Sequence, residues 1–202
     1  MKKILGVLTI VVLLVSVCFY FFPKQPKNIF DEIYQETEKT YRSNNILRNI
    51  DGFKIRPDWS SDDPNISYTP FGKYETLPKG YSDITIDLNF GKGIKGVLIL
   101  FERKTNSNIT LWYSAHYNMQ KKVLKKELAI FEEPRKPGQF IDDEEKVREY
   151  LRKNNISKEE LEKDFDEIVN QKVLKDWCSI YDSKYSPSNY GDVKVETQWE
   201  NW

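Results

Sequence analysis

Histidine and cysteine are scarce in this chain: its 202 residues include one histidine and two cysteines. A metal site of the usual histidine and cysteine type lacks ligands here, so we expect neither a metal nor another cofactor. Charge of one sign is not in excess either, because 31 basic residues balance 31 acidic ones. Nucleic-acid-binding proteins normally show a clustered basic excess, and this balance argues against such a partner. The length suits one globular domain and not comfortably two.

Charged residues are also absent from one long stretch, the 19 residues Ile4–Phe22. As a helix this stretch measures roughly 28 Å, close to the thickness of a bilayer's hydrocarbon core. Lys2 and Lys3 precede it and favour a cytoplasmic N-terminus. A cleaved signal peptide and a lipoprotein modified at Cys18 are the alternatives. The first of these is disfavoured because no alanine precedes Ala115 to form an A-x-A-like cleavage site.

The sequence therefore divides into a membrane anchor over residues 1–22, a spacer over 23–27 and an extracellular domain over 28–202. This outer domain contains one cysteine, Cys178, so it cannot form an intrachain disulfide. An exported domain without disulfides fits the inner wall zone of a Gram-positive envelope. We expect a single-pass protein at the cell membrane.

Hydrophobic spacing divides the outer domain into helical and extended parts. Asn28 is placed to cap a helix that ends near residues 43–45. The segment 51–80 is rich in turn formers and has room only for short strands. Strict apolar and polar alternation then predicts strands over 84–90 and 109–117. Further strands are predicted over 97–103 and over 123–131, where lysines interrupt both faces.

Two further helices are predicted, capped by Asp142 and Ser157, before a final strand over 193–199. Helix, meander, helical hairpin and last strand make an α+β fold. We expect an antiparallel sheet with about three helices on one face.

A glycine-rich segment, Gly91–Gly96, matches the G-x-G-x-x-G pattern of dinucleotide-binding sites. Such a site needs a helix directly after the glycines, so that the helix N-terminus meets the pyrophosphate. Here the next residues are Val97–Phe101, which read as a strand. The glycines are therefore predicted to form a hairpin loop rather than a phosphate site.

Few residues offer catalytic chemistry. His116 lies two residues from Ser114 on one strand face, which is adjacency and not a triad. Cys178 ends an amphipathic helix, where packing explains it. Asp87 and Glu102 lie on neighbouring strands and could act as the carboxylate pair of a glycosidase. Since no enclosing loops are predicted around them, we expect no catalytic residues and no enzyme.

The second face of the predicted sheet mixes charged and aromatic side chains. An exposed tryptophan is typical of protein-binding surfaces, although Trp112 could instead pack beneath the loops of 51–80. The residues predicted to bind a partner through this face are Asp87, Asn89, Glu102, Thr110, Trp112, His116, Lys125 and Glu127.

The chain opens with an uncleaved anchor, a short spacer and a helix reading Asn28-Ile-Phe-Asp-Glu-Ile-Tyr34, and a sheet and helices follow. In these features it resembles the TipC family of immunity proteins of Gram-positive bacteria. The resemblance implies a crescent of three helices and a seven-stranded sheet, displayed on the outer face of the membrane. It also implies that the concave sheet surface engages a TelC-like toxin, which type VII secretion exports and which cleaves the wall precursor lipid II.

Sequence and resemblance together predict a non-enzymatic immunity protein that binds a secreted toxin and occludes it with its sheet surface. Neither a nucleic acid nor a small-molecule substrate is expected. Two alternatives stay open. One is an envelope hydrolase acting on wall glycan or a lipid precursor, centred on Asp87, Glu102 and His116. The other is an anchored assembly or sensor subunit.

Overall fold

A computed structural model describes residues 25–42, 53–58, 65–70, 80–89, 95–105, 108–132 and 140–200. The predicted anchor, 1–22, lies outside these residues. None of the helices in the described ranges has the length and apolar composition to cross a bilayer.

The described part of the chain forms one seven-stranded sheet in the order β1 to β7. Its strands are β1 (Phe53–Asp58), β2 (Asn65–Pro70), β3 (Tyr81–Asn89), β4 (Gly96–Lys104), β5 (Ile109–Asn118), β6 (Val123–Glu132) and β7 (Lys194–Thr197). The helices are α2 (Ile29–Arg42), α3 (Glu144–Lys153), α4 (Lys158–Phe165) and α5 (Lys175–Tyr181), with a π-helix, η1 (Asp166–Leu174), between α4 and α5. The predicted α+β class is confirmed.

Strand pairing follows the chain, with one departure from the predicted antiparallel sheet. Neighbours from β1 to β6 are antiparallel, whereas β7 pairs parallel to β6. The prediction was wrong for this last strand. All the C-terminal helices lie between β6 and β7, and such a long connection allows a parallel pair, which a tight hairpin cannot form.

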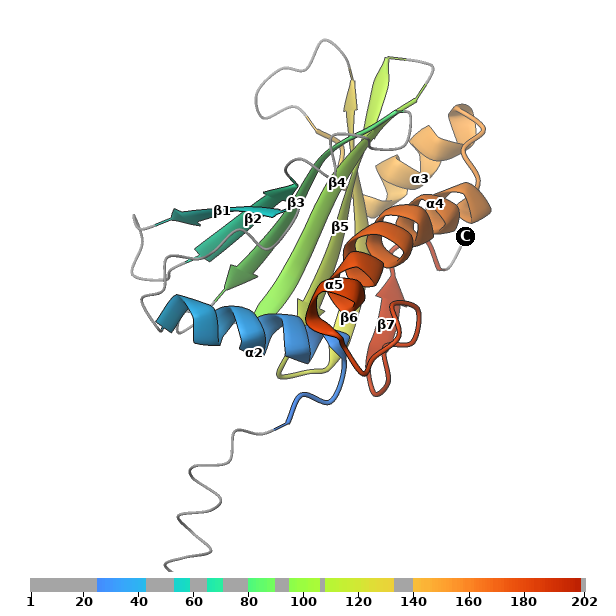
Figure 1. The fold of residues 1–202 in the computed structure, drawn as a ribbon. Coiled ribbons are helices and arrows are strands. Elements are labelled where there is room, and N and C mark those ends of the chain that lie inside the picture. Colours follow the sequence, from blue (N-terminus) through green and yellow to red (C-terminus); the bar gives the residue numbers. More distant parts are fainter. Residues whose placement is uncertain are drawn as a thin grey trace, which may run out of the picture.

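The helices α2, α4 and α5 lie across one face of the sheet, and α3 lies near one end of it (Figure 1). Alternate residues of the central strands point into the core beneath them. Phe101 stacks on Tyr113 with ring centroids 4.4 Å apart, and Tyr117 stacks on Phe30 of α2 at 5.0 Å. The fully buried members on β4 and β5 include Val97, Ile99, Phe101, Leu111, Tyr113 and Tyr117.

The start of α2 is fixed as the sequence predicts. The side-chain oxygen of Asn28 accepts the backbone N–H of Asp31 at 2.9 Å, which caps the helix. The Asn28 amide donates to the hydroxyl of Tyr117 and to Asp192, both at 3.0 Å. The hydroxyl of Tyr185 also donates to the carbonyl of Pro26. These contacts fix the residues just before α2 against one end of the domain.

The C-terminal helices differ from the prediction in two details. Asp143, not Asp142, caps α3, accepting the N–H of Lys146 at 3.1 Å. The predicted single second helix contains η1 in its middle. Its buried pairs Ile168–Val169 and Val173–Leu174 repeat every five residues, which matches the i→i+5 bonding of a π-helix.

Replacing the cap of α4 is expected to have a moderate effect. Ser157 accepts the N–H of Glu160 at 3.2 Å, so Ser157→Ala should cost about 1 kcal/mol of unfolding free energy. Ser157→Thr keeps a capping hydroxyl and should stay near the parent. Chemical unfolding of both variants, followed by tryptophan fluorescence, measures the difference. Equal stability of the two variants would show that the cap contributes nothing.

Candidate functional site

The face of the sheet opposite the helices is built by alternate residues of β4, β5 and β6. We call it the outer face. In the described part of the chain, the long helices cover only the other side (Figure 1). The outer-face residues of β5 and β6 are Thr110, Trp112, Ser114, His116, Lys125, Glu127, Ala129 and Phe131.

Strand register shows which of the predicted residues lie together. Glu102 pairs with Trp112, and His116 pairs with Lys125 on one side and with Leu98 on the other. The backbone of Asp87 aligns with Leu98, which places it in the same row. In the remaining positions, Glu127 pairs with Ser114, Asn89 pairs with Gly96, and Thr110 pairs with Phe131.

Two of the predicted residues are not exposed. Glu102 is 7% exposed and Thr110 is fully buried. The prediction that they contribute to an exposed surface was therefore wrong. The register explains it, because Trp112 lies directly beside Glu102 and Phe131 directly beside Thr110. A large aromatic side chain at a directly paired position shields a smaller cross-strand neighbour from water.

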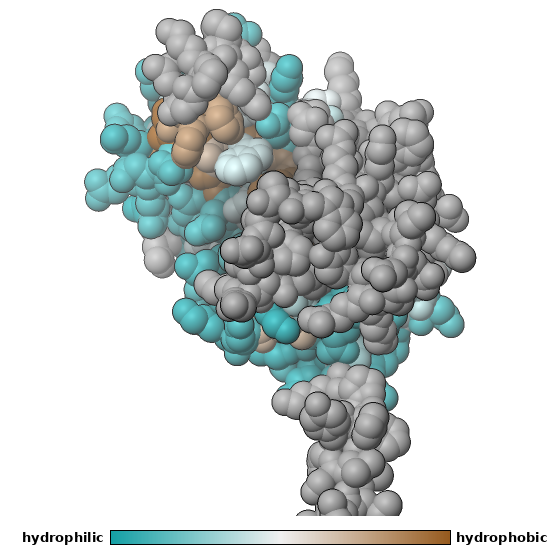
Figure 2. All heavy atoms as spheres, turned by 90° about the vertical axis from the view of Figure 1, so that its left-hand side faces the viewer, coloured by the Kyte–Doolittle hydropathy of each residue, from teal (hydrophilic) through white to brown (hydrophobic). Residues whose placement is uncertain are grey.

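An aromatic cluster occupies one end of the outer face. Trp112 contacts Phe131 edge-on with ring centroids 6.2 Å apart, and Phe131 lies 5.8 Å from Phe140. Phe140 is 47% exposed. It is held there because Ile141 and Ile130 exchange backbone hydrogen bonds of 2.9 Å, which attach this segment to β6. Figure 2 shows a brown apolar patch on this side of the molecule, with teal polar residues to its left and below it.

A groove of about 250 Å³ opens beside this cluster. We call it the Trp112 groove. Its lining residues are Trp112, Ser114, Glu127, Leu128, Ala129, Phe140, Asp142 and Gln198. Phe140, Asp142 and Gln198 were not predicted as site residues. Phe140 and Asp142 lie in the connection after β6, where no strand or helix periodicity assigns a side chain to a face.

Two of the predicted hydrolase residues, Glu102 and His116, do not converge. Glu102 is level with Trp112, and His116 lies four residues further along β5, about 14 Å away along the strand. Neither residue lines the Trp112 groove. The described ranges contain no cluster of three potential metal ligands. Cys178 donates to the carbonyl of Tyr185 at 3.3 Å, and burial raises the pKa of its thiol, which disfavours the reactive thiolate.

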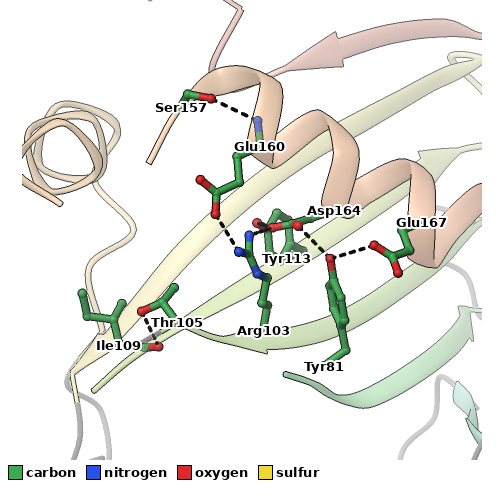
Figure 3. A network of polar contacts seen from close by, with 9 residues as sticks. All are labelled: Tyr81, Arg103, Thr105, Ile109, Tyr113, Ser157, Glu160, Asp164 and Glu167. Atoms are coloured by element: carbon green, nitrogen blue, oxygen red, sulfur yellow. Dashed lines mark hydrogen bonds and ion pairs between the residues drawn. The ribbon is translucent and has the colours of Figure 1, made fainter. Parts of the chain in front are cut away.

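A buried polar network ties α4 to the helix-covered face of the sheet (Figure 3). Asp164 is 3% exposed and accepts the hydroxyls of Tyr113 and Tyr81, the latter at 2.7 Å. Arg103 reaches Asp164 at 2.5 Å and Glu160 at 2.6 Å. Burial, followed by the charge of Asp164, holds the pKa of Tyr113 well above its ordinary value. The phenol stays protonated and donates, so this network is structural.

The family model of TipC immunity protein-like proteins matches residues 1–198. The chain belongs to the TipC immunity protein-like family. A solved structure, TipC2 from Streptococcus intermedius B196, is 42% identical and superposes with a TM-score of 0.77. The match covers 89% of this chain and 100% of that one. No curated protein sequence matches the chain. The resemblance to this immunity-protein family that the sequence predicted is confirmed.

Proposed function

We propose that this TipC-like chain is a membrane-anchored immunity protein that binds a secreted, TelC-like toxin with its outer face and blocks it sterically. The observation that carries the proposal is the outer face itself. It presents a partly exposed aromatic cluster and a groove on the side of the sheet that the long helices leave uncovered. Aromatic anchors of this kind contribute most of the binding energy in protein interfaces.

The position of the tether supports this orientation. Residues 26–28 contact Tyr185 and Asp192 at the end of the domain where β5 meets β6, and Lys122 of that turn pairs with Asp31. Trp112 lies six residues before Asn118, the end of β5, which is about 20 Å along the strand. An anchor at 1–22 would therefore hold the Trp112 groove away from the bilayer, within reach of a toxin arriving from outside.

Charged residues around the groove suit a specific protein partner. Lys125 and Glu127 are exposed next to each other along β6, and His116 is partly exposed one strand away. Charges of both signs at a rim steer association and penalise wrong partners more than they add affinity. We therefore expect related toxins that differ in surface charge to be discriminated here.

Protection from outside the membrane is tested in sensitive bacterial cells that export a TelC-like, lipid II-cleaving toxin. The full chain should restore growth. A variant without residues 1–22 should accumulate in the cytoplasm and fail to protect, since it never meets the toxin. Attaching an unrelated single-pass anchor to that variant should restore growth. Full protection by the anchorless protein retained in the cytoplasm would contradict the proposed location.

The two alternatives predict results that an immunity protein would not give. An envelope hydrolase requires turnover of wall glycan or lipid II by the purified chain in the absence of any toxin. An assembly or sensor subunit requires a stable complex with other membrane proteins. The envelope hydrolase is disfavoured because Glu102 is only 7% exposed and its cross-strand partner, Trp112, lies four residues from His116 on β5.

A further inference from the structure

The Trp112 groove is sized for one side chain of a partner. Its volume of about 250 Å³ lies below the range of about 300–1,000 Å³ that is usual for small-molecule sites. Trp112 and Phe140 give it apolar, aromatic walls, and Ser114 and Gln198 add polar atoms. The Gln198 carbonyl is already engaged, because it accepts the N–H of Leu128 at 2.7 Å.

Two carboxylates line the groove, those of Glu127 and Asp142. Glu127 and Asp142 are both exposed, and neither has a hydrogen bond or ion pair within the described part of the chain. A purely apolar occupant would remove water from these charges without replacing it, which is costly. An anionic occupant, such as a pyrophosphate-bearing lipid, would be repelled. Charge complementarity therefore selects a cation with an apolar stem.

The chain itself uses this combination of groups on the helix-covered face. The ammonium of Lys126 lies 4.1 Å from the ring centroid of Phe165 and 2.7 Å from Glu162. A cation over an aromatic ring, paired with a carboxylate, is a stable arrangement in proteins. In the Trp112 groove the aromatic rings and the carboxylates are present, and none of its described lining residues is a lysine or arginine.

We propose that the Trp112 groove receives an arginine side chain of the bound toxin, an inference that rests on the proposed function. The guanidinium stacks on Trp112 and donates to Glu127 and Asp142. Arginine fits better than lysine, because its flat fork stacks on aromatic faces and presents five N–H donors that two carboxylates can share.

The groove is tested without the toxin by titrating the full chain, in nanodiscs, with N-acetyl-arginine amide. The readout is the ¹⁵N indole resonance of Trp112, identified by its absence in Trp112→Phe. N-acetyl-citrulline amide has nearly the same shape without the charge and serves as the matched control ligand. We expect the indole to shift with the arginine probe, with citrulline at least about tenfold weaker because the charge-assisted hydrogen bonds are lost. Glu127→Gln combined with Asp142→Asn should abolish the difference.

Measurements of toxin affinity distinguish a failure of this proposal from a failure of the proposed function. Glu127→Lys with Asp142→Lys should lower toxin affinity at least about 100-fold, because two carboxylates become like charges. Lys163→Glu on the far face of α4 serves as the control. An arginine probe that causes no shift would overturn the groove assignment, even where the toxin still binds. If the arginine probe binds but the Glu127→Lys, Asp142→Lys variant keeps full toxin affinity, the groove does not receive an arginine side chain of the toxin. An indole shift that depends only on protein concentration would assign the groove to a second copy of the chain.

Discussion

Asp164→Ala is expected to lower the free energy of unfolding by about 3 kcal/mol, the low end of the range for breaking a buried charge pair. Asp164 accepts the hydroxyl of Tyr113 and binds Arg103 at 2.5 Å. Removing this carboxylate leaves the buried hydroxyl of Tyr113 without its acceptor and takes away one of the two carboxylates that pair with Arg103. The loss stays at the low end because Arg103 is partly exposed and keeps Glu160 at 2.6 Å. Urea unfolding of the full chain in detergent micelles, followed by tryptophan fluorescence, measures the change.

Glu167→Gln is the matched control for Asp164→Ala. Glu167 belongs to the same network, but its contact with the hydroxyl of Tyr81 is 3.4 Å long. This substitution should change the unfolding free energy by no more than about 0.5 kcal/mol. If Asp164→Ala were as mild as its control, the network would not be what holds α4 on the sheet.

Trp112→Ala is expected to weaken toxin binding by about 30-fold or more, the size of a loss at an interface hot spot. The ring forms one wall of the groove and its edge contact with Phe131 supports the aromatic cluster. Calorimetric titration of the parent and the variant measures the loss. The fold should survive, because Trp112 lies on the outer face and is only partly buried.

Two substitutions keep the result for Trp112 interpretable. Trp112→Phe retains an aromatic wall and should lose less affinity than Trp112→Ala. Lys163→Ala removes an exposed side chain from α4 on the opposite side of the sheet and should leave binding unchanged. Unfolding of Trp112→Ala would instead place this ring in the core and remove it from the interface.

Sequence periodicity predicted the central strands well because successive side chains along a strand alternate between its two faces. On β5, residues from Leu111 to Tyr117 alternate between the helix-covered core and the outer face. Period 2 fixes a residue's face, and this is why Trp112 and His116 were placed correctly. It does not fix how deeply a residue is covered. Coverage depends also on which side chain the neighbouring strand places beside the residue, and Glu102 is paired with the large ring of Trp112.

Tertiary contacts account for the other differences. Ser157 and Glu160 read as a reciprocal capping box, and the Ser157 half is present. The Glu160 carboxylate instead binds Arg103 of β4 at 2.6 Å, a partner that no local pattern reveals. The same limit applies to Phe140. It joins the site only because Ile141 pairs with Ile130, and a single bridge leaves no periodic signal in the sequence.

We infer that the outer face, and not the helix-covered face, meets the toxin. The most direct measurement is hydrogen exchange of the full chain in nanodiscs, with and without an equimolar TelC-like toxin. We predict a tight one-to-one complex in which exchange slows at β5, β6 and residues 140–142, while the amides of α2 and α4 are unchanged. Slowed exchange confined to the helices, with β5 and β6 unaffected by bound toxin, would contradict the account.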